Sequence, residues 1–235
     1  MSRWVLAGNW TPRERQYAVA FSAASLAFGA SFAMVATGAG LGPVTVLAMA
    51  ALVFGGGAQF GALGVMLAGG APAAAVAVGL ALNSRFLLMG LSAGSRLRMG
   101  PIRRLLAAIV SIDASLLVAM SAPSGEDPDR SFWRVGLSVF VTWQLGTVAG
   151  LLLGGAIPAP ETLGLDALIA TVFIGLLAPL LSDSAARLAA LTGGVVCVVT
   201  LPVLPPGMPV LVGAVVGSGI ASAASGLRSV PGGAP

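Results

Sequence analysis

The sequence Phe54-Gly-Gly-Gly-Ala-Gln-Phe60 interrupts a hydrophobic segment that is otherwise long enough to cross a lipid bilayer. Apolar residues lead from Val44 to this sequence, and the apolar run resumes at Ala62. Each glycine inside a helix costs about 1 kcal/mol relative to alanine, and an open turn leaves backbone polar groups exposed. Hydrocarbon tolerates such groups only where protein covers them or where they line a wet cavity. The motif therefore predicts a broken membrane helix that forms part of a binding site.

The composition of the chain also indicates a membrane protein. Of its 235 residues, 57% are hydrophobic and only 9% are charged, whereas a soluble domain has roughly 25% charged residues. The lipid bilayer is therefore the expected surroundings of the chain. The basic residues are all arginines, and most of them separate apolar runs, as the positive-inside rule describes. They form no basic and aromatic stripe, so we expect no nucleic-acid partner.

The residue inventory argues against an enzyme. The chain has no histidine, which excludes histidine metal sites and Ser-His-Asp triads, and its one cysteine, Cys197, lies in an apolar segment. No nucleotide-binding loop is present, and Asp113 is the one clear acidic candidate inside the apolar segments. We therefore expect no catalytic residues, no metal and no cofactor.

Eight hydrophobic segments are each close to the roughly 20 residues that cross a bilayer as a helix. Their small residues allow close helix packing, so we expect an all-α, polytopic membrane helix bundle. We expect a cytoplasmic N-terminal segment over 1–15, one transmembrane domain over 16–226 and a flexible tail over 227–235. The hydrophobic segments fall at 16–38, 44–68, 73–92, 104–121, 133–155, 165–182, 187–203 and 209–226.

The arginine distribution predicts a topology. Arg13 and Arg15 place the N-terminus inside, and the arginines from Arg96 to Arg104 place the loop after the third segment inside as well. Both placements are possible if segment 44–68 is broken or re-entrant and turns back at its glycines. That topology has seven crossings and puts the acidic loop Glu126-Asp127-Pro128-Asp129 outside. The alternative is a continuous, kinked span at 44–68 that violates the charge rule.

Several short motifs follow one another in order along the chain. They are Phe54 to Phe60, Leu82-Asn-Ser-Arg-Phe86, Ser111-Ile-Asp113, Trp143-Gln-Leu-Gly-Thr147, and Leu163-Gly-Leu-Asp166 with Phe173 and Pro179. Together these motifs resemble the AzlC-type branched-chain amino-acid permease family over about residues 16 to 226. The resemblance implies the large subunit of a two-component exporter in the bacterial inner (plasma) membrane. Such a subunit exports valine, leucine and isoleucine together with a small AzlD-type membrane subunit.

Two positions depart from the family pattern. Members often have histidine where this chain has Phe86, and an acidic residue where it has Ala114. If either group normally carries protons, this chain couples differently or prefers another substrate. The alternatives are therefore a carrier for another small amphipathic metabolite, or a channel-like or structural membrane subunit.

Arg85 and Asp113 are the two charges that lie well inside predicted spans, where charged residues are costly and often functional. They lie at similar depth, about 10 and 13 Å from the facing ends of consecutive spans at 1.5 Å per residue. We predict a salt bridge between them. Either it only holds two helices together, or Arg85 binds a substrate carboxylate while Asp113 positions Arg85 or accepts a proton.

Other polar residues complete the candidate substrate site. Asn83 points about 160° away from Arg85 on a regular helix and faces the pocket only if the helix is distorted. Gln59 can donate and accept hydrogen bonds, either to substrate or between helices. The candidate substrate-binding residues are Gly55, Gly56, Gly57, Gln59, Asn83, Arg85, Asp113, Trp143, Thr147 and Pro179.

A faint internal similarity predicts an inverted repeat, with chance similarity as the alternative. The pattern from Ala27 to Gly56 resembles the pattern from Gln144 to Gly175. Transporters with inverted repeats bind substrate between the copies, near interrupted helices in corresponding positions. Here those interruptions are the Gly55–Gly57 glycines and Pro179, whose ring frees carbonyls for substrate.

Overall fold

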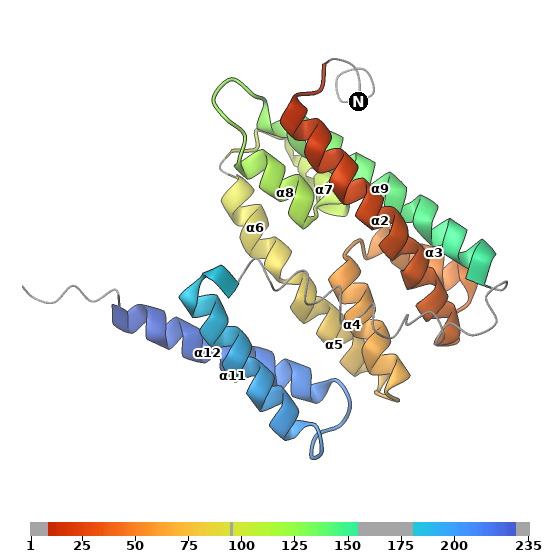
Figure 1. Cartoon of the computed structure of the whole chain (residues 1–235), viewed down its shortest axis with the longest axis vertical. Coiled ribbons are helices and arrows are strands. Elements are labelled where there is room, and N and C mark those ends of the chain that lie inside the picture. Colours follow the sequence, from red (N-terminus) through yellow and green to blue (C-terminus); the bar gives the residue numbers. More distant parts are fainter. Residues whose placement is uncertain (1–8, 95, 155–180, 229–235) are drawn as a thin grey trace, which may run out of the picture. The chain divides into compact units, whose positions relative to one another are not determined.

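The computed structural model describes residues 9–94, 96–154 and 181–228, and every regular element in these ranges is a helix (Figure 1). This confirms the all-α prediction for the described residues. The helices are α2 (Pro12–Gly38), α3 (Pro43–Leu52), α4 (Gly56–Leu67), α5 (Pro72–Asn83), α6 (Arg85–Gly94), α7 (Pro101–Val110), α8 (Asp113–Met120), α9 (Pro128–Leu153), α11 (Ser184–Thr200) and α12 (Met208–Arg228).

Within the described ranges, three helical stretches are long and apolar enough to cross a membrane. They are α2, α9 and the stretch Pro72–Leu91, which α5 and α6 form together. Shorter apolar helices are α3, α4, α11 and Met208–Ala224. The structure thus agrees with the prediction of a polytopic membrane protein, whereas the number of crossings stays a prediction.

The chain divides into two compact units. The first comprises residues 1–60 and 82–165, and the second comprises 61–81 and 166–235. The prediction of one transmembrane domain over 16–226 stays a prediction. In the second unit, α11 and α12 form a hairpin with close backbone contact, because a Cβ on Gly193 would lie 2.8 Å from the Gly213 carbonyl oxygen.

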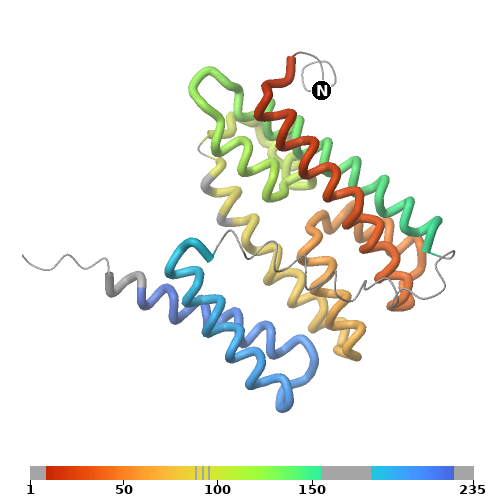
Figure 2. Tube along the Cα trace, in the orientation of Figure 1, coloured from red at the N-terminus to blue at the C-terminus, as the bar shows by residue number. Residues whose placement is uncertain are grey.

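The first unit is organised around α2 and α9, which lie side by side and run in the same direction (Figure 2). Glycines allow this approach, since a Cβ on Gly146 would lie 2.2 Å from the Leu26 carbonyl oxygen. Ser25 adds a hydrogen bond from its Oγ to the Val139 carbonyl oxygen at 2.9 Å. Small residues and side-chain hydrogen bonds of this kind hold membrane helices together.

Polar contacts show which chain segments share the N-terminal end of α2. Arg13 forms an ion pair with Glu126, in the loop before α9. The Arg98 amide, just before α7, donates to Asp129 Oδ1 at 2.9 Å. The acidic loop therefore lies at the same end as Arg13, and its predicted placement on the opposite side is wrong.

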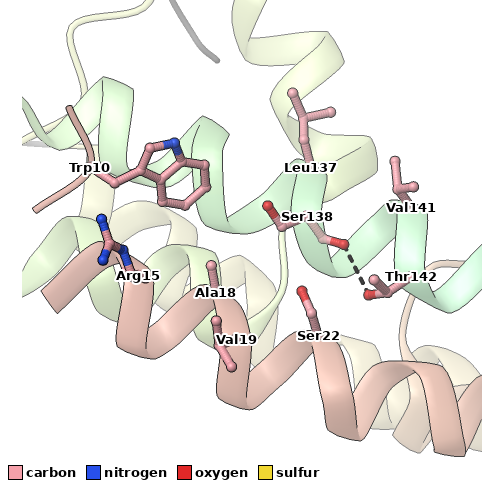
Figure 3. Close-up of a pocket in the computed structure, with 9 residues that line it drawn as sticks. All are labelled: Trp10, Arg15, Ala18, Val19, Ser22, Leu137, Ser138, Val141 and Thr142. Atoms are coloured by element: carbon pink, nitrogen blue, oxygen red, sulfur yellow. Dashed lines mark hydrogen bonds between the residues drawn. The ribbon is translucent and has the colours of Figure 1, made fainter. Parts of the chain in front are cut away.

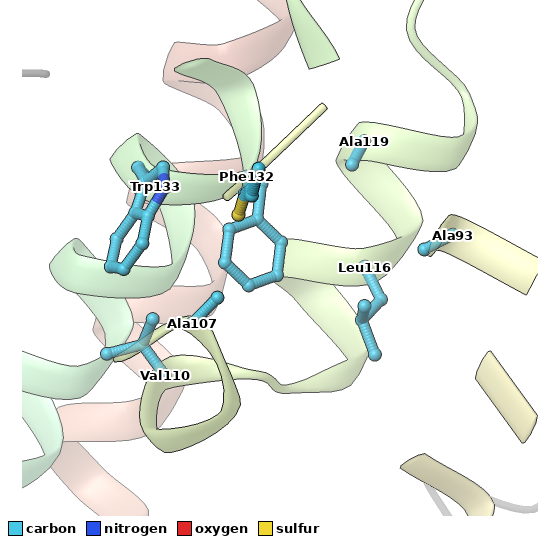
Figure 4. Close-up of a cluster of buried hydrophobic side chains, with 8 residues drawn as sticks. Ala93, Ala107, Val110, Leu116, Ala119, Phe132 and Trp133 are labelled. Carbon is cyan, nitrogen blue, oxygen red and sulfur yellow. The ribbon is translucent and has the colours of Figure 1, made fainter. Parts of the chain in front are cut away.

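The reason is that residues 101–120 form two short helices and not the predicted continuous span. At 1.5 Å per residue, α7 and α8 are about 15 and 12 Å long, too short to cross the hydrocarbon. The chain turns at Ser111 and Ile112 and returns to the end where α7 begins. The ends of α6, α7 and α8 pack with the start of α9 in one apolar cluster, whose members include Ala93, Val110, Leu116, Ala119, Phe132 and Trp133 (Figure 4).

Candidate functional site

The glycine motif lies where the chain breaks between α3 and α4. Gln59, in the first turns of α4, donates from Nε2 to the carbonyl oxygens of Met49 and Val53, both at 2.8 Å. Gln144 of α9 donates from Nε2 to the Ala50 carbonyl oxygen at 2.9 Å. The last carbonyls of a helix have no partner within it, so these two amides satisfy the open end of α3.

The same hydrogen bonds show that the chain folds back at the break. In a straight helix, residues 49 and 59 would be about 15 Å apart along the axis. The side chain of Gln59 instead reaches the Met49 carbonyl directly. A broken helix was predicted with its turn at Gly55 to Gly57. The break is present, but it lies at Val53 to Gly55, because Gly56 and Gly57 already belong to α4.

Aromatic rings enclose the break. Phe54 packs edge-to-face on Phe140 and Trp143, with ring centroids 5.1 and 6.2 Å away. A Cβ on Gly56 would lie 3.0 Å from Cη2 of Trp143, so the indole packs closely against the glycine backbone. Trp143 is only 4% exposed, and it forms part of the wall of the site.

A second helix break, between α5 and α6, places Asn83 next to the break between α3 and α4. The helical run from α5 to α6 is interrupted at Ser84, immediately after Asn83. A Cβ added to Gly55 would lie 2.5 Å from Asn83 Oδ1, so the amide lies against the glycine backbone. The sequence predicted that Asn83 reaches the site only if its helix is distorted, and the helix is distorted there.

Arg85 and Asp113 form the predicted salt bridge. Arg85 Nη2 lies 2.9 Å from Asp113 Oδ2, and the side chains are 35% and 32% exposed. Arg85 is the first residue of α6 and Asp113 is the first residue of α8, so each charge lies at a helix break. The Asp113 carboxylate also complements the positive N-terminal end of α8. Phe86 lies beneath the Arg85 guanidinium, whose Cζ is 4.9 Å from the ring centroid.

Three polar atoms of the site are buried without a hydrogen-bond partner in the described part of the chain. They are Gln59 Oε1, an acceptor, and the donors Trp143 Nε1 and Arg85 Nε. Buried polar groups in native proteins almost always have a partner. A small ligand with both donor and acceptor groups can supply one to each. Among the described residues, no group of three or more acidic, histidine or cysteine side chains could hold a metal ion.

The remaining predicted residues lie elsewhere or are not described. Thr147 is fully buried and donates from Oγ1 to the Trp143 carbonyl oxygen at 2.9 Å, in the interface of α9 with α2. Gly57 is buried beside the break. Pro179 and most of the second copy of the predicted repeat lie outside the described residues.

The sequence interpretation missed a fully buried ion pair in the first unit. Glu14 Oε2 lies 2.8 Å from Arg134 Nη1, and both side chains are 0% exposed. Ser131 also donates from Oγ to Glu14 Oε1 at 2.8 Å. The available signal was the spacing Thr11-x-x-Glu14, which forms a capping box at the start of α2.

Interrupted helices that bring polar and charged groups together inside an apolar body are typical of membrane transporters. The chain is, by these features, a polytopic α-helical membrane protein with a polar site at its helix breaks. It belongs to the AzlC family, because the model of that family, described as AzlC protein, matches residues 20–157. This membership indicates transport of amino acids across a membrane. No curated protein and no solved structure matches the chain.

Proposed function

We propose that the chain is a secondary transporter that exports valine, leucine and isoleucine across the bacterial inner membrane by alternating access. In this proposal it acts together with a small AzlD-type membrane subunit. The observation that carries the proposal is the partly exposed ion pair of Arg85 and Asp113, placed where two helices begin. Charged residues inside membrane spans usually mark substrate or ion pathways.

The chemistry of the pair suits an amino acid. A guanidinium binds a carboxylate through two parallel hydrogen bonds, so a substrate carboxylate competes with Asp113 for Arg85. When the substrate occupies Arg85, Asp113 is free to bind the substrate ammonium group or a proton. Phe54 and Trp143, at the neighbouring break, provide apolar surface for a branched side chain.

The breaks also support a topology for the proposed transporter. We propose that residues 44–68 and 101–120 are re-entrant and enter the membrane from opposite sides. In support, α3 begins just after the C-terminal end of α2, whereas α7 begins near its N-terminal end. Because residues 101–120 return to the side from which they enter, this topology has six crossings, one fewer than the predicted seven. The first turn brings Gly55 close to Asn83, and the second brings Asp113 close to Arg85. In this proposal the substrate site lies between the two turns.

Counterflow into proteoliposomes tests the proposal. Purified protein, with and without the AzlD-type subunit, is loaded with unlabelled valine and supplied with labelled valine or isoleucine. A carrier gives saturable uptake that depends on internal substrate, and Arg85→Ala abolishes it without loss of membrane insertion. Arg104→Ala is the matched control, because Arg104 is exposed in the first turn of α7. Uptake that is unaffected by internal substrate would instead indicate a channel and refute the carrier.

A carrier for another small amphipathic metabolite is the second candidate. It is favoured by Phe86, whose ring occupies a position beside Arg85 where the family often has histidine. The same counterflow assay with a panel of labelled amino acids and amines distinguishes the two. Exchange of valine by the wild type at rates below those of unbranched or cationic substrates would favour the second candidate.

A further inference from the structure

A surface groove of the first unit runs between the N-terminal half of α2 and the middle of α9 (Figure 3). It has a volume of about 830 Å³. Arg15, Val19 and Ser22 line one wall, at the spacing of a single helix face, and Val141 and Thr142 line the other. Trp10 lies at one end, beside Arg15 (Figure 3). The groove thus has one polar, aromatic end and leads along two apolar helices.

The walls of the groove present carbon atoms, because the hydroxyl groups of α9 bond within their own helix. Thr142 donates from Oγ1 to the Ser138 carbonyl oxygen at 2.9 Å, and Ser138 donates from Oγ to the Arg134 carbonyl oxygen at 2.8 Å. Ser22 Oγ is buried and has no hydrogen-bond partner in the described ranges. Its hydroxyl is directed toward α9 in Figure 3. A ligand of this groove is therefore mainly hydrocarbon.

The polar end of the groove carries positive charge. Arg15 is exposed and takes part in none of the ion pairs found in the described part of the chain. Tryptophan and arginine at the end of a span are typical of the membrane interface. This end of the first unit is rich in arginines, namely Arg13, Arg15, Arg96, Arg98, Arg103, Arg104, Arg130 and Arg134, against the carboxylates Glu14, Glu126, Asp127 and Asp129.

A second groove begins at the same residues. It has a volume of about 500 Å³, shares Trp10, Arg15 and Val19 with the first, and continues along Gln16 and Ala20. Two apolar grooves therefore diverge from one cationic residue. That arrangement matches an amphiphile with two hydrocarbon chains and one anionic head group.

We propose that these two grooves bind one anionic glycerophospholipid. Its phosphate contacts Arg15, its ester region lies against the Trp10 indole, and its two acyl chains follow the two grooves. Charge complementarity favours this occupant over a partner helix. A helix is about 10 Å wide with its side chains and would need an apolar surface where the chain presents a guanidinium.

Native mass spectrometry of the full-length protein in detergent tests the proposal. The protein is titrated with phosphatidylglycerol and with phosphatidylcholine of identical acyl chains. We expect the wild type to bind phosphatidylglycerol more tightly than phosphatidylcholine. Arg15→Gln should lower the affinity for phosphatidylglycerol about fivefold, which corresponds to about 1 kcal/mol per arginine at an anionic surface. Its affinity for phosphatidylcholine should not change. Val19→Trp fills both grooves and should weaken both lipids. The controls are Arg104→Gln and Val148→Trp, which lie outside the grooves.

A second measurement uses the folded wild type, so that it does not depend on the Val19→Trp variant folding. Brominated phosphatidylglycerol in liposomes should quench tryptophan fluorescence more than brominated phosphatidylcholine, and Trp10→Phe should remove the excess. Equal binding of the two lipids by the wild type, or an excess of quenching that persists without Trp10, overturns the proposal. A cross-link between Val19→Cys and the AzlD-type subunit also overturns the proposal if phosphatidylglycerol does not lower its yield. The groove would then hold a protein.

Discussion

Arg85 Nη2 lies 2.9 Å from Asp113 Oδ2, and this ion pair joins the first residue of α6 to the first residue of α8. Both helices begin there because the chain breaks at Ser84 and at Ser111 and Ile112. The pair therefore connects two breaks, and Asn83 at the first of them also contacts Gly55 in the glycine motif. The ion pair thus joins two helix breaks directly and lies next to a third through Asn83.

Exchanging the two charges separates binding from structural support. The double variant Arg85→Asp, Asp113→Arg restores an ion pair, so we expect membrane insertion and thermal stability close to wild type. We expect valine counterflow to fall below about one-tenth, because the guanidinium no longer starts from α6 and misses the substrate carboxylate. Counterflow at the wild-type rate in the exchanged variant would show that the pair only holds the helices together.

Arg85→Lys keeps the charge but not the planar, bidentate geometry of the guanidinium. We expect the KM for valine to rise roughly tenfold, which corresponds to about 1.4 kcal/mol of binding free energy. Membrane insertion should not change. The measurement is counterflow against valine concentration, with Arg104→Lys as the control for a conservative change at an exposed arginine. An unchanged KM would place the carboxylate-binding group elsewhere.

Gly55→Ala tests the contact between the first two breaks. The added Cβ would lie 2.5 Å from Asn83 Oδ1, the tip of a side chain that can rotate away. We therefore expect a loss of stability under about 1 kcal/mol, because a flexible side chain yields more easily than backbone. Transport should fall severalfold, because Asn83 leaves the site. Gly38→Ala is the matched control, because nothing lies within 4 Å of its added Cβ. Transport at the control level would exclude Asn83 from the site.

The parts of the site that could be predicted from the sequence are those with a strong local signal. Three consecutive glycines before Gln59 predicted a helix break, since no other residue costs a helix as much except proline. The depths of Arg85 and Asp113 in consecutive spans predicted their ion pair. The first prediction rests on helix propensity and the second on distances along the chain, and both features are present in the structure.

The break at Ser111 and Ile112 has no such signal, because neither residue is glycine or proline. Side-chain hydrogen bonds end one helix and start the next: Ser111 donates from Oγ to the Ala107 carbonyl oxygen at 2.8 Å, and Ser115 Oγ accepts from the Ile112 amide at 3.0 Å. Serine competes with regular helix bonding in this way only when tertiary packing favours it. The Glu14–Arg134 pair also could not be predicted from the sequence, because Glu14 precedes the apolar stretch that defined the first span.

Gln59→Leu tests the support of the α3 end. The variant keeps the volume but removes two hydrogen bonds, which leaves the Val53 carbonyl without its side-chain donor. We expect a loss of about 1–3 kcal/mol in the free energy of unfolding, because buried acceptors without a partner are costly. Unfolding by SDS titration gives this value. Gln16→Leu is the control, since Gln16 is exposed on α2. An equal loss in both variants would contradict the capping role of Gln59.

Gly146→Ala tests the close packing of α2 against α9. The added Cβ would lie 2.2 Å from the Leu26 carbonyl oxygen, which is backbone and cannot rotate away. We expect a loss of about 1–3 kcal/mol, the usual cost of overpacking. The matched control is Gly154→Ala, at the C-cap of α9, whose Cβ would meet Met34 Cγ at an ordinary 3.5 Å. Equal thermal unfolding temperatures for the two variants would show that the helices separate easily.

The buried Glu14–Arg134 pair provides the sharpest stability test. Arg134→Met leaves the Glu14 carboxylate with its hydrogen bonds from Ser131 and Thr11 but without a neutralising charge. We expect a loss of about 3–5 kcal/mol, the usual result of breaking a buried ion pair. The double variant Glu14→Leu, Arg134→Met should recover most of this loss, because no buried charge remains. Arg104→Met, at an exposed arginine, should cost under about 1 kcal/mol. If the double variant unfolds as easily as Arg134→Met in SDS titration, the pair acts through its shape and packing and not through its charge.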